Sequence, residues 1–127
     1  MRALVIDDSR TMRRIIVGVL TALGFETVEA ADGRQALDVL EQGIEVDLAC
    51  IDWNMPVMNG LEFVVAVRER KDWRGVTLMM VTTESEHGQI VRALAAGAHE
   101  YMIKPFTPDA VKEKLQLLGL VEIEELV

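Results

Sequence analysis

Five short apolar runs alternate with five helix-like segments along this 127-residue chain, and that alternation restricts the fold more than any other feature. The apolar runs predict strands at 3–6, 26–30, 47–51, 77–82 and 100–103. Capping residues, apolar stripes and glycine stops predict helices at about 9–23, 32–43, 59–71, 85–97 and 107–119. Strands that alternate with helices give right-handed crossovers and a parallel sheet covered on both faces. We therefore expect an α/β fold, a flavodoxin-like (βα)5 doubly wound parallel sheet with strand order 2-1-3-4-5.

Polar side chains stand where four of these strands end. Asp7 and Asp8 follow the first strand, Asp52 follows the third, and Thr82 and Lys104 close the fourth and fifth. In an open parallel sheet the carboxyl ends of the strands form the edge at which ligands bind. The order 2-1-3-4-5 places the first and third strands side by side, so we expect the three acids to converge there.

Three neighbouring carboxylates repel one another, and two charges about 5 Å apart cost roughly 3 kcal/mol at an effective dielectric of 20. A shared proton or a bound cation must therefore relieve the site. Oxygen ligands without histidine or cysteine favour a hard ion, and a few protein ligands completed by water or phosphate favour Mg²⁺. A carboxylate in such a site can attack phosphorus, while a lysine and a hydroxyl stabilise the transferring group.

Composition narrows the partners. The net charge of −8 argues against a nucleic-acid surface, which requires a basic stripe. No apolar run approaches the length of about 20 residues that spans a membrane, and no signal peptide is recognisable, so we expect a cytoplasmic protein. The one cysteine, Cys50, lies in a buried run and is interpreted as a core residue. Within the helix at 85–97, capped by Ser85, we expect Ile90, Val91, Leu94 and Ala95 to face inward, and we expect solvated rings for His87 and His99.

The chain resembles a bacterial two-component response-regulator receiver domain, most closely the single-domain chemotaxis regulators of the CheY type. The likeness covers nearly the whole chain and rests on motifs that occur in the family's order: Asp7-Asp8, Asp52-Trp53-Asn54-Met55-Pro56, Met58-Asn59-Gly60, Thr82, Tyr101 and Lys104-Pro105-Phe106. The resemblance implies that Asp52 accepts a phosphoryl group from the phosphohistidine of a sensor histidine kinase. It also implies that Mg²⁺ is bound by Asp8, Asp52 and the Asn54 backbone carbonyl, with Asp7 acting through water.

The resemblance further implies how the signal is read. Thr82 moves toward the phosphoryl group, Tyr101 turns inward, and the face made by helix 4, strand 5 and helix 5 changes its partners. It also implies a cis Lys104–Pro105 bond. The expected downstream target is a protein, with a flagellar motor switch protein as the first choice.

Two positions are expected to set the lifetime of the signal, Asn54 and Glu84, each two residues after a key side chain. In the family, polar residues there place the hydrolytic water, and this pair predicts dephosphorylation in seconds to minutes. The chain would then be no enzyme, although it assists its own phosphotransfer and autodephosphorylation. Thr83 departs from the family, which usually has Ala or Gly there, and its β-branched side chain is expected to narrow access to Asp52.

Several alternatives remain open at this point. The expected organisation is a receiver domain at 1–119 with a short acidic tail at 120–127 and no output domain. The protein could instead be a phosphate sink, a phosphorelay intermediate, or the receiver fragment of a longer regulator. A haloacid-dehalogenase-like phosphatase is a remote alternative, because that enzyme needs a second acid at the position of Asn54.

Overall fold

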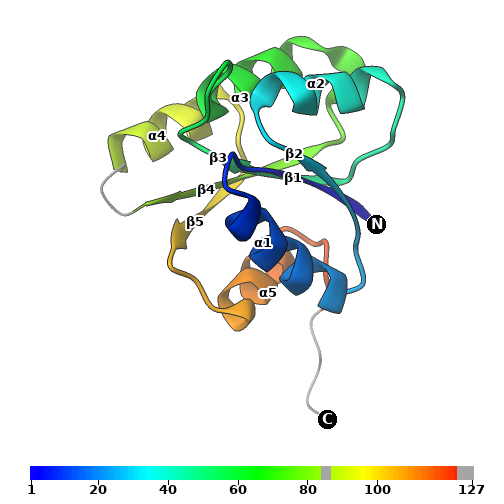
Figure 1. Cartoon of the computed structure of the whole chain (residues 1–127), viewed down its shortest axis with the longest axis vertical. Coiled ribbons are helices and arrows are strands. Elements are labelled where there is room, and N and C mark those ends of the chain that lie inside the picture. The colour runs from blue at the N-terminus through cyan, green and yellow to red at the C-terminus, as the bar shows by residue number, and fades with distance from the viewer. Residues whose placement is uncertain (84–86, 123–127) are drawn as a thin grey trace.

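The computed structural model describes residues 1–83 and 87–122, and these contain one five-stranded parallel sheet (Figure 1). The strands are β1 (Arg2–Ile6), β2 (Glu26–Ala30), β3 (Leu48–Asp52), β4 (Thr77–Thr83) and β5 (Glu100–Lys104). Their order is β2-β1-β3-β4-β5, which confirms the predicted topology. In the register Ile6 pairs with both Ala30 and Ile51, so β1 lies between β2 and β3.

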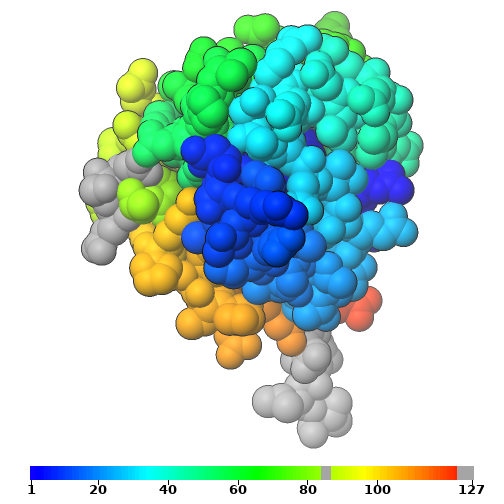
Figure 2. All heavy atoms as spheres, in the orientation of Figure 1, coloured from blue at the N-terminus to red at the C-terminus, as the bar shows by residue number. Residues whose placement is uncertain are grey.

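Helices cover both faces of this sheet. They are α1 (Arg10–Ala22), α2 (Gly33–Glu41), α3 (Gly60–Glu69), α4 (His87–Ala96) and α5 (Pro108–Leu117), with a short 3₁₀ turn η1 (Lys71–Trp73). α1 and α5 lie on one face, and α2, α3 and α4 lie on the other (Figure 1). In the space-filling view the surfaces of α1 (dark blue) and α5 (orange) adjoin (Figure 2). α3 ends within the limits predicted for the third helix, and the η1 turn begins at Lys71, the last residue of the predicted range.

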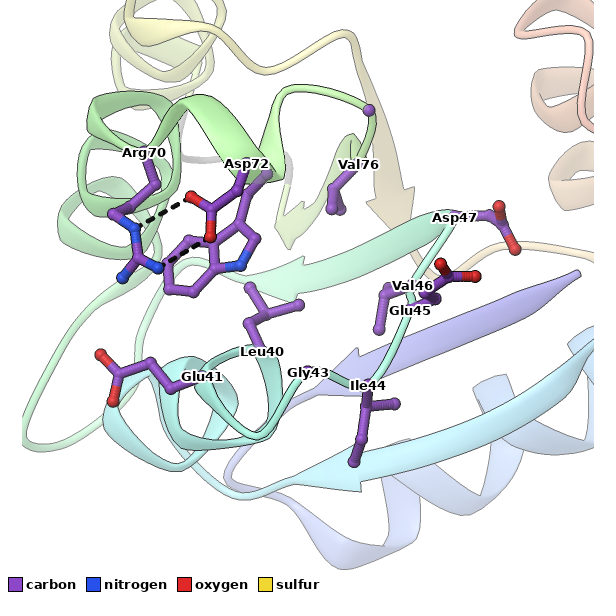
Figure 3. A pocket seen from close by; sticks show the side chains of 12 residues that line it. Leu40, Glu41, Gly43, Ile44, Glu45, Val46, Asp47, Arg70, Asp72 and Val76 are labelled. Carbon is purple, nitrogen blue, oxygen red and sulfur yellow. Dashed lines mark hydrogen bonds and ion pairs between the residues drawn. The ribbon is translucent and has the colours of Figure 1, made fainter.

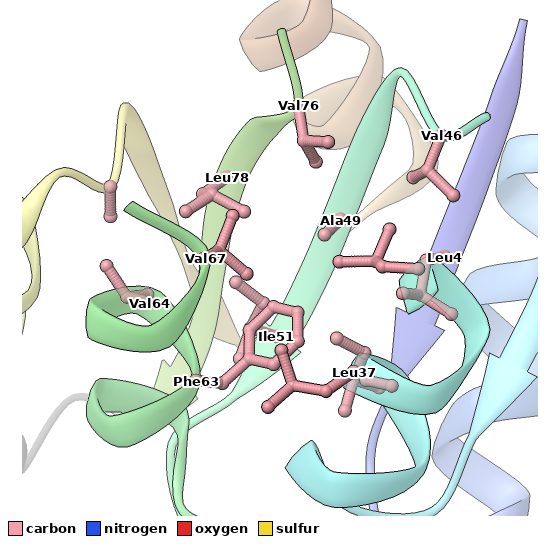
Figure 4. Close-up of a cluster of buried hydrophobic side chains, with 14 of the residues drawn as sticks. Leu4, Leu37, Val46, Ala49, Ile51, Phe63, Val64, Val67, Val76 and Leu78 are labelled. Carbon is pink, nitrogen blue, oxygen red and sulfur yellow. The ribbon is translucent and has the colours of Figure 1, made fainter. Parts of the chain in front are cut away.

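The strands are buried on both sides, as an all-parallel sheet requires. Leu4, Ala49 and Ile51 face the cluster that packs beneath α2 and α3 together with Phe63 and Val67 (Figure 4). The alternate residues Val5 and Cys50 belong to a second cluster beneath α1 and α5. Burial raises the pKa of the Cys50 thiol to about 12, which agrees with a core role for this residue.

Helix caps hold the start of several helices next to the carboxyl edge of the sheet. The side chain of Ser9 accepts from the Met12 N–H at the start of α1, as predicted. Asn59 and Glu62 form a reciprocal capping box at the start of α3. Such caps satisfy backbone donors that the first helical turn leaves unpaired. The cap predicted at Ser85 lies outside the described residues.

One prediction about side chains was wrong. Val91 and Leu94 are 66% and 37% exposed, and Ala95 is also exposed, so α4 buries only Ile90 and Ala93. A helix over the outermost strands covers a narrow strip of sheet and buries a correspondingly narrow stripe. His87 and His99 are exposed, as predicted, and the Nδ1 atom of His99 in addition accepts a hydrogen bond from the Leu78 N–H. In the described part of the chain, no helix has the length and apolar character needed to cross a membrane.

Candidate functional site

The three acids meet at the carboxyl edge of β1 and β3, as the strand order predicted. Asp7 follows β1 and is 1% exposed, Asp52 ends β3 and is 8% exposed, and Asp8 is open to solvent. One carboxylate oxygen from each lies within 4.8 Å of the others. Because β1 and β3 are hydrogen-bonded neighbours, the backbone itself holds the acids together.

A single lysine partly neutralises the two buried acids. Lys104 ends β5, and its Nζ donates to Asp52 Oδ1 at 3.0 Å and to Asp7 Oδ2 at 3.2 Å. The Lys104–Pro105 peptide bond is cis, as the family resemblance implied. The second oxygen of Asp7 accepts from the Ser9 N–H at 2.8 Å. Asp7 is therefore engaged at both oxygens, by the ammonium group and by the start of α1.

Burial and like charge make Asp52 a weaker acid than usual. Burial first, and then the charge of Asp7, raise the pKa of Asp52 to about 6, although Lys104 opposes the shift. For Lys104 burial alone would lower the pKa, but the hydrogen bond and the charge of Asp52 outweigh it, and the net direction is upward. Asp52 thus remains largely ionised at neutral pH, where a carboxylate can act as a nucleophile.

The hydroxyl and the aromatic predicted to act as switches stand on the neighbouring strands. Thr82 is 2% exposed on β4, and the next residue, Thr83, is exposed. Tyr101 is half-buried on β5, and Lys114 Nζ of α5 lies 4.6 Å from its ring centroid. Lys114 also donates to Glu100 Oε1 at 3.1 Å. Asn54 is exposed in the loop after Asp52, and Glu84 lies outside the described residues.

Three residues near the acids have structural roles that the sequence analysis did not give them. The Gly60 N–H donates to Trp53 O, and a Cβ at Gly60 would lie 2.7 Å from Asp52 O. Val57 has a φ of +69° while being 81% exposed, which is rare for a β-branched residue. Arg13 Nη1 donates to the Asp7 carbonyl at 2.6 Å. The motif Met58-Asn59-Gly60 already drew attention to Gly60, whereas nothing in the sequence marks Val57.

The donor set fits a hard divalent cation. Asp8 is exposed to solvent, and Asp52 uses one of its oxygens for Lys104, so each has carboxylate oxygen available. All the candidate ligands are oxygens, which matches Mg²⁺ rather than a softer metal. Such an ion, when bound, supplies positive charge that offsets the repulsion among the acids and polarises an incoming phosphoryl group.

A separate hollow of about 390 Å³ opens at the opposite, amino-terminal edge of the sheet (Figure 3). Leu40, Glu41, Ile44 and Val76 line it, and Arg70 bonds to Asp72 above them. None of the predicted site residues contributes to this hollow, and the acids that line it are not among those that meet at Asp52. The hollow is therefore separate from the strand-end acids.

Known proteins share both the sequence and the fold. The response regulator receiver domain family matches residues 3–116. The chain is 49% identical to a chemotaxis protein CheY homolog of Campylobacter jejuni, over 91% of this chain and 90% of that protein. It is 44% identical to chemotaxis protein CheY1 of Helicobacter pylori, over 93% and 96% of the two chains. The crystal structure of Vibrio cholerae chemotaxis protein CheY4 superposes with a TM-score of 0.83 at 37% identity, covering 91% of this chain and 96% of that one.

These matches cover the strands, the acids and Lys104 together, and they agree with the topology and with the geometry at the sheet edge. The chain belongs to the response-regulator receiver family, whose members signal by phosphorylation rather than acting as classical enzymes.

Proposed function

We propose that this protein is a phosphorylation-activated switch of the chemotaxis type that carries its phosphoryl group on Asp52. The observation that supports it most is the grouping of Asp7, Asp8, Asp52 and Lys104 at one edge of the sheet. Family membership and the similarity to chemotaxis proteins support the same reading.

In the proposed transfer an ionised Asp52 oxygen attacks the phosphorus of a kinase phosphohistidine. The new bond joins Asp52 oxygen to phosphorus, the phosphorus–nitrogen bond breaks, and its electron pair returns to the imidazole of the kinase. Lys104 already lies 3.0 Å from Asp52, so its charge is placed to stabilise the transferring group. Asp8, Asp52 and the Asn54 carbonyl would hold Mg²⁺, with Asp7 acting through water.

The proposed output passes through β4 and β5. The buried hydroxyl of Thr82 would donate to a phosphoryl oxygen, and Tyr101 would move into the space that Thr82 leaves. The surface of α4, β5 and α5 would then change its partner, for which a flagellar motor switch protein is the first candidate. Exposed Val91 and Leu94 give α4 an apolar surface suited to such a contact. Asn54 and Glu84 would position the water that hydrolyses the acyl phosphate.

The proposed organisation is a receiver unit at 1–119 followed by the tail at 120–127. Within that tail, Leu120 and Val121 pack against the cluster under α1 and α5, so at least these two residues adhere to the domain.

Tryptophan emission tests the proposal. Trp53 adjoins Asp52 and is expected to change its emission when Mg²⁺ and then beryllofluoride are added. Trp73 lies on η1 at the opposite edge and is expected to give a constant background. Asp52→Asn must abolish the beryllofluoride step. An unchanged response in that variant, or steady turnover of free phosphomonoesters by the wild-type protein, would contradict the proposal.

A further inference from the structure

An arginine and a histidine meet at the amino-terminal edge of the sheet, at the other end of the strands from the acids. Arg68 of α3 extends across the turn that follows α4. Its Nε donates to Gly97 O at 3.0 Å, and one terminal nitrogen donates to Val76 O at 2.9 Å. The same terminal nitrogen lies 3.3 Å from His99 Nδ1. Arg68 therefore links α3 to the residue that follows α4, Gly97, and to the residue that precedes β4, Val76.

His99 makes hydrogen bonds with both the backbone N–H and the backbone carbonyl of Leu78. Its Nδ1 accepts from the Leu78 N–H at 3.1 Å, and its own backbone N–H donates to Leu78 O at 2.8 Å. The ladder between β4 and β5 begins at the pair Met79 and Glu100, one residue later. The imidazole nitrogen thus takes the place of a backbone carbonyl and extends the ladder by one bond.

This arrangement works only with a neutral ring. Two N–H groups point at Nδ1, which must therefore carry a lone pair, so the ring proton resides on Nε2. An imidazolium would place an N–H against both donors and a positive charge beside Arg68. The charged groups around it offer no compensation, since α3 contributes Arg68 and the neighbouring Glu100 is bonded to Lys114 of α5. Burial, and next the charge of Arg68, lower the pKa of His99.

A glycine allows the arginine to lie across the turn. Gly97 has a φ of +122°, and a Cβ there would lie 2.7 Å from Arg68 Cγ. The end of α4 is thus shaped both for a left-handed turn and for close passage of this side chain.

We propose that His99 is an acid-sensitive latch that fastens the end of α4 and the start of β5 to α3 while its ring is neutral. When solvent delivers a proton to Nδ1, the Leu78 N–H loses its acceptor and Arg68 is repelled. The opened form binds that proton at the ordinary histidine value near 6.5, whereas the latched form resists it. Falling pH therefore draws the population toward the opened form, independently of any chemistry at Asp52.

Two substitutions at His99 separate the acceptor from the charge. His99→Asn keeps an oxygen at the δ position that can accept from Leu78 but cannot be protonated, and His99→Ala removes the acceptor. All proteins carry Asp52→Asn, so that the proton of Asp52 does not contribute. We measure hydrogen-exchange protection of the Leu78 amide and of the last turn of α4 at pH 7.5 and 5.5, and the titration of the His99 ring by NMR.

We expect acid to lower the Leu78 protection of the histidine protein by about tenfold relative to His99→Asn, since only the histidine gains a charge. His99→Ala should show weak protection at both pH values. The His99 ring should titrate at a lower pH in the folded protein than in the same protein unfolded in urea. The latch would be overturned if the ratio of Leu78 protection between the histidine protein and His99→Asn were the same at both pH values. A His99 ring that titrates at the same or a higher pH in the folded protein than in the unfolded one would also overturn it. If His99→Asn does not fold, the ring titration alone decides.

Discussion

Lys104 donates a 3.0 Å hydrogen bond to Asp52 although the two residues end strands that are separated by β4. The lysine side chain spans the end of the intervening strand and reaches Asp7 as well. One positive charge thus serves two buried negative charges, which leaves the site short of positive charge at neutral pH. This imbalance gives the first prediction.

Stability is expected to fall as pH rises through the range in which Asp52 loses its proton. The pKa of Asp52 is raised from 3.8 to about 6, so between these values the folded chain holds a proton that the unfolded chain has released. The free energy of unfolding therefore decreases from about pH 4 to about pH 6 and then levels off as far as this group is concerned.

Asp52→Asn removes the loss of stability that ionisation of Asp52 causes. At pH 7 the variant should be more stable than the wild type by about 1 kcal/mol, a modest value because water and counterions screen the site. Near pH 4 the two proteins should be equally stable. Urea unfolding at both pH values measures the difference, and a gap of the same size at both would show that Asp52 is not responsible.

Gly60→Ala should destabilise the loop that follows Asp52. A Cβ at Gly60 would approach Asp52 O at 2.7 Å and Trp53 Cα at 3.1 Å, and backbone atoms cannot yield cheaply. We expect a loss of about 2 kcal/mol in the free energy of unfolding. Gly18→Ala in α1 is the matched control, because its Cβ meets nothing within 4 Å and alanine favours helix by about 1 kcal/mol. Equal effects of the two changes in urea unfolding would contradict this reading.

Relief of backbone strain at Val57 should stabilise the protein. Its φ of +69° is costly for a valine and readily adopted by glycine or asparagine. Since the side chain is 81% exposed, its removal forfeits little burial. Val57→Asn is expected to raise the free energy of unfolding by about 1 kcal/mol. Val57→Ala, which lacks the polar side chain that lets asparagine bond to the local backbone at positive φ, should gain less, and a loss of stability in Val57→Asn would refute the assignment of strain.

Lys114→Met should release the ring of Tyr101. Lys114 lies over that ring and is also bonded to Glu100, so the substitution removes two restraints on the switch residue. We expect a stability loss of about 1 kcal/mol. The chain has one tyrosine, so its NMR ring signals are unambiguous and should shift and broaden. Lys112→Met in the same helix is the control. Unchanged ring signals in Lys114→Met would show that Lys114 does not restrain the Tyr101 ring.

Thr83→Ala should speed phosphorylation by small donors such as acetyl phosphate. Thr83 is exposed immediately after the buried Thr82, and its β-branched side chain is predicted to narrow the approach to Asp52. The rate can be followed by Trp53 emission with Mg²⁺ present. Rates that match the wild type would dismiss the idea that Thr83 obstructs the site.

The sequence allowed the topology and the meeting of the acids to be predicted, because alternating elements and strand order leave few arrangements. Asp7, Asp52 and Lys104 lie where a five-stranded order places the ends of β1, β3 and β5. The prediction failed where a side chain's fate depends on distant packing. Val91 was predicted to face inward from the helical period, but it is 66% exposed because α4 overlies only the outer strands. His99 is exposed as predicted, but its contacts with Arg68 and Leu78 could not be predicted from the sequence.

The positive φ of Val57 could not be predicted either, since only glycine or asparagine in a sequence would have suggested such a conformation. Local pattern thus predicted the elements and the site, and tertiary contacts decided the details.

The burial of Cys50 on β3 gives the protein a chemical reporter of its own. The thiol is 1% exposed in the central strand, and its raised pKa keeps it from forming the reactive thiolate. A thiol reagent can therefore react with Cys50 only when the central strands of the sheet separate and expose the side chain. The rate of alkylation would therefore report how often the strands separate, without any engineered label.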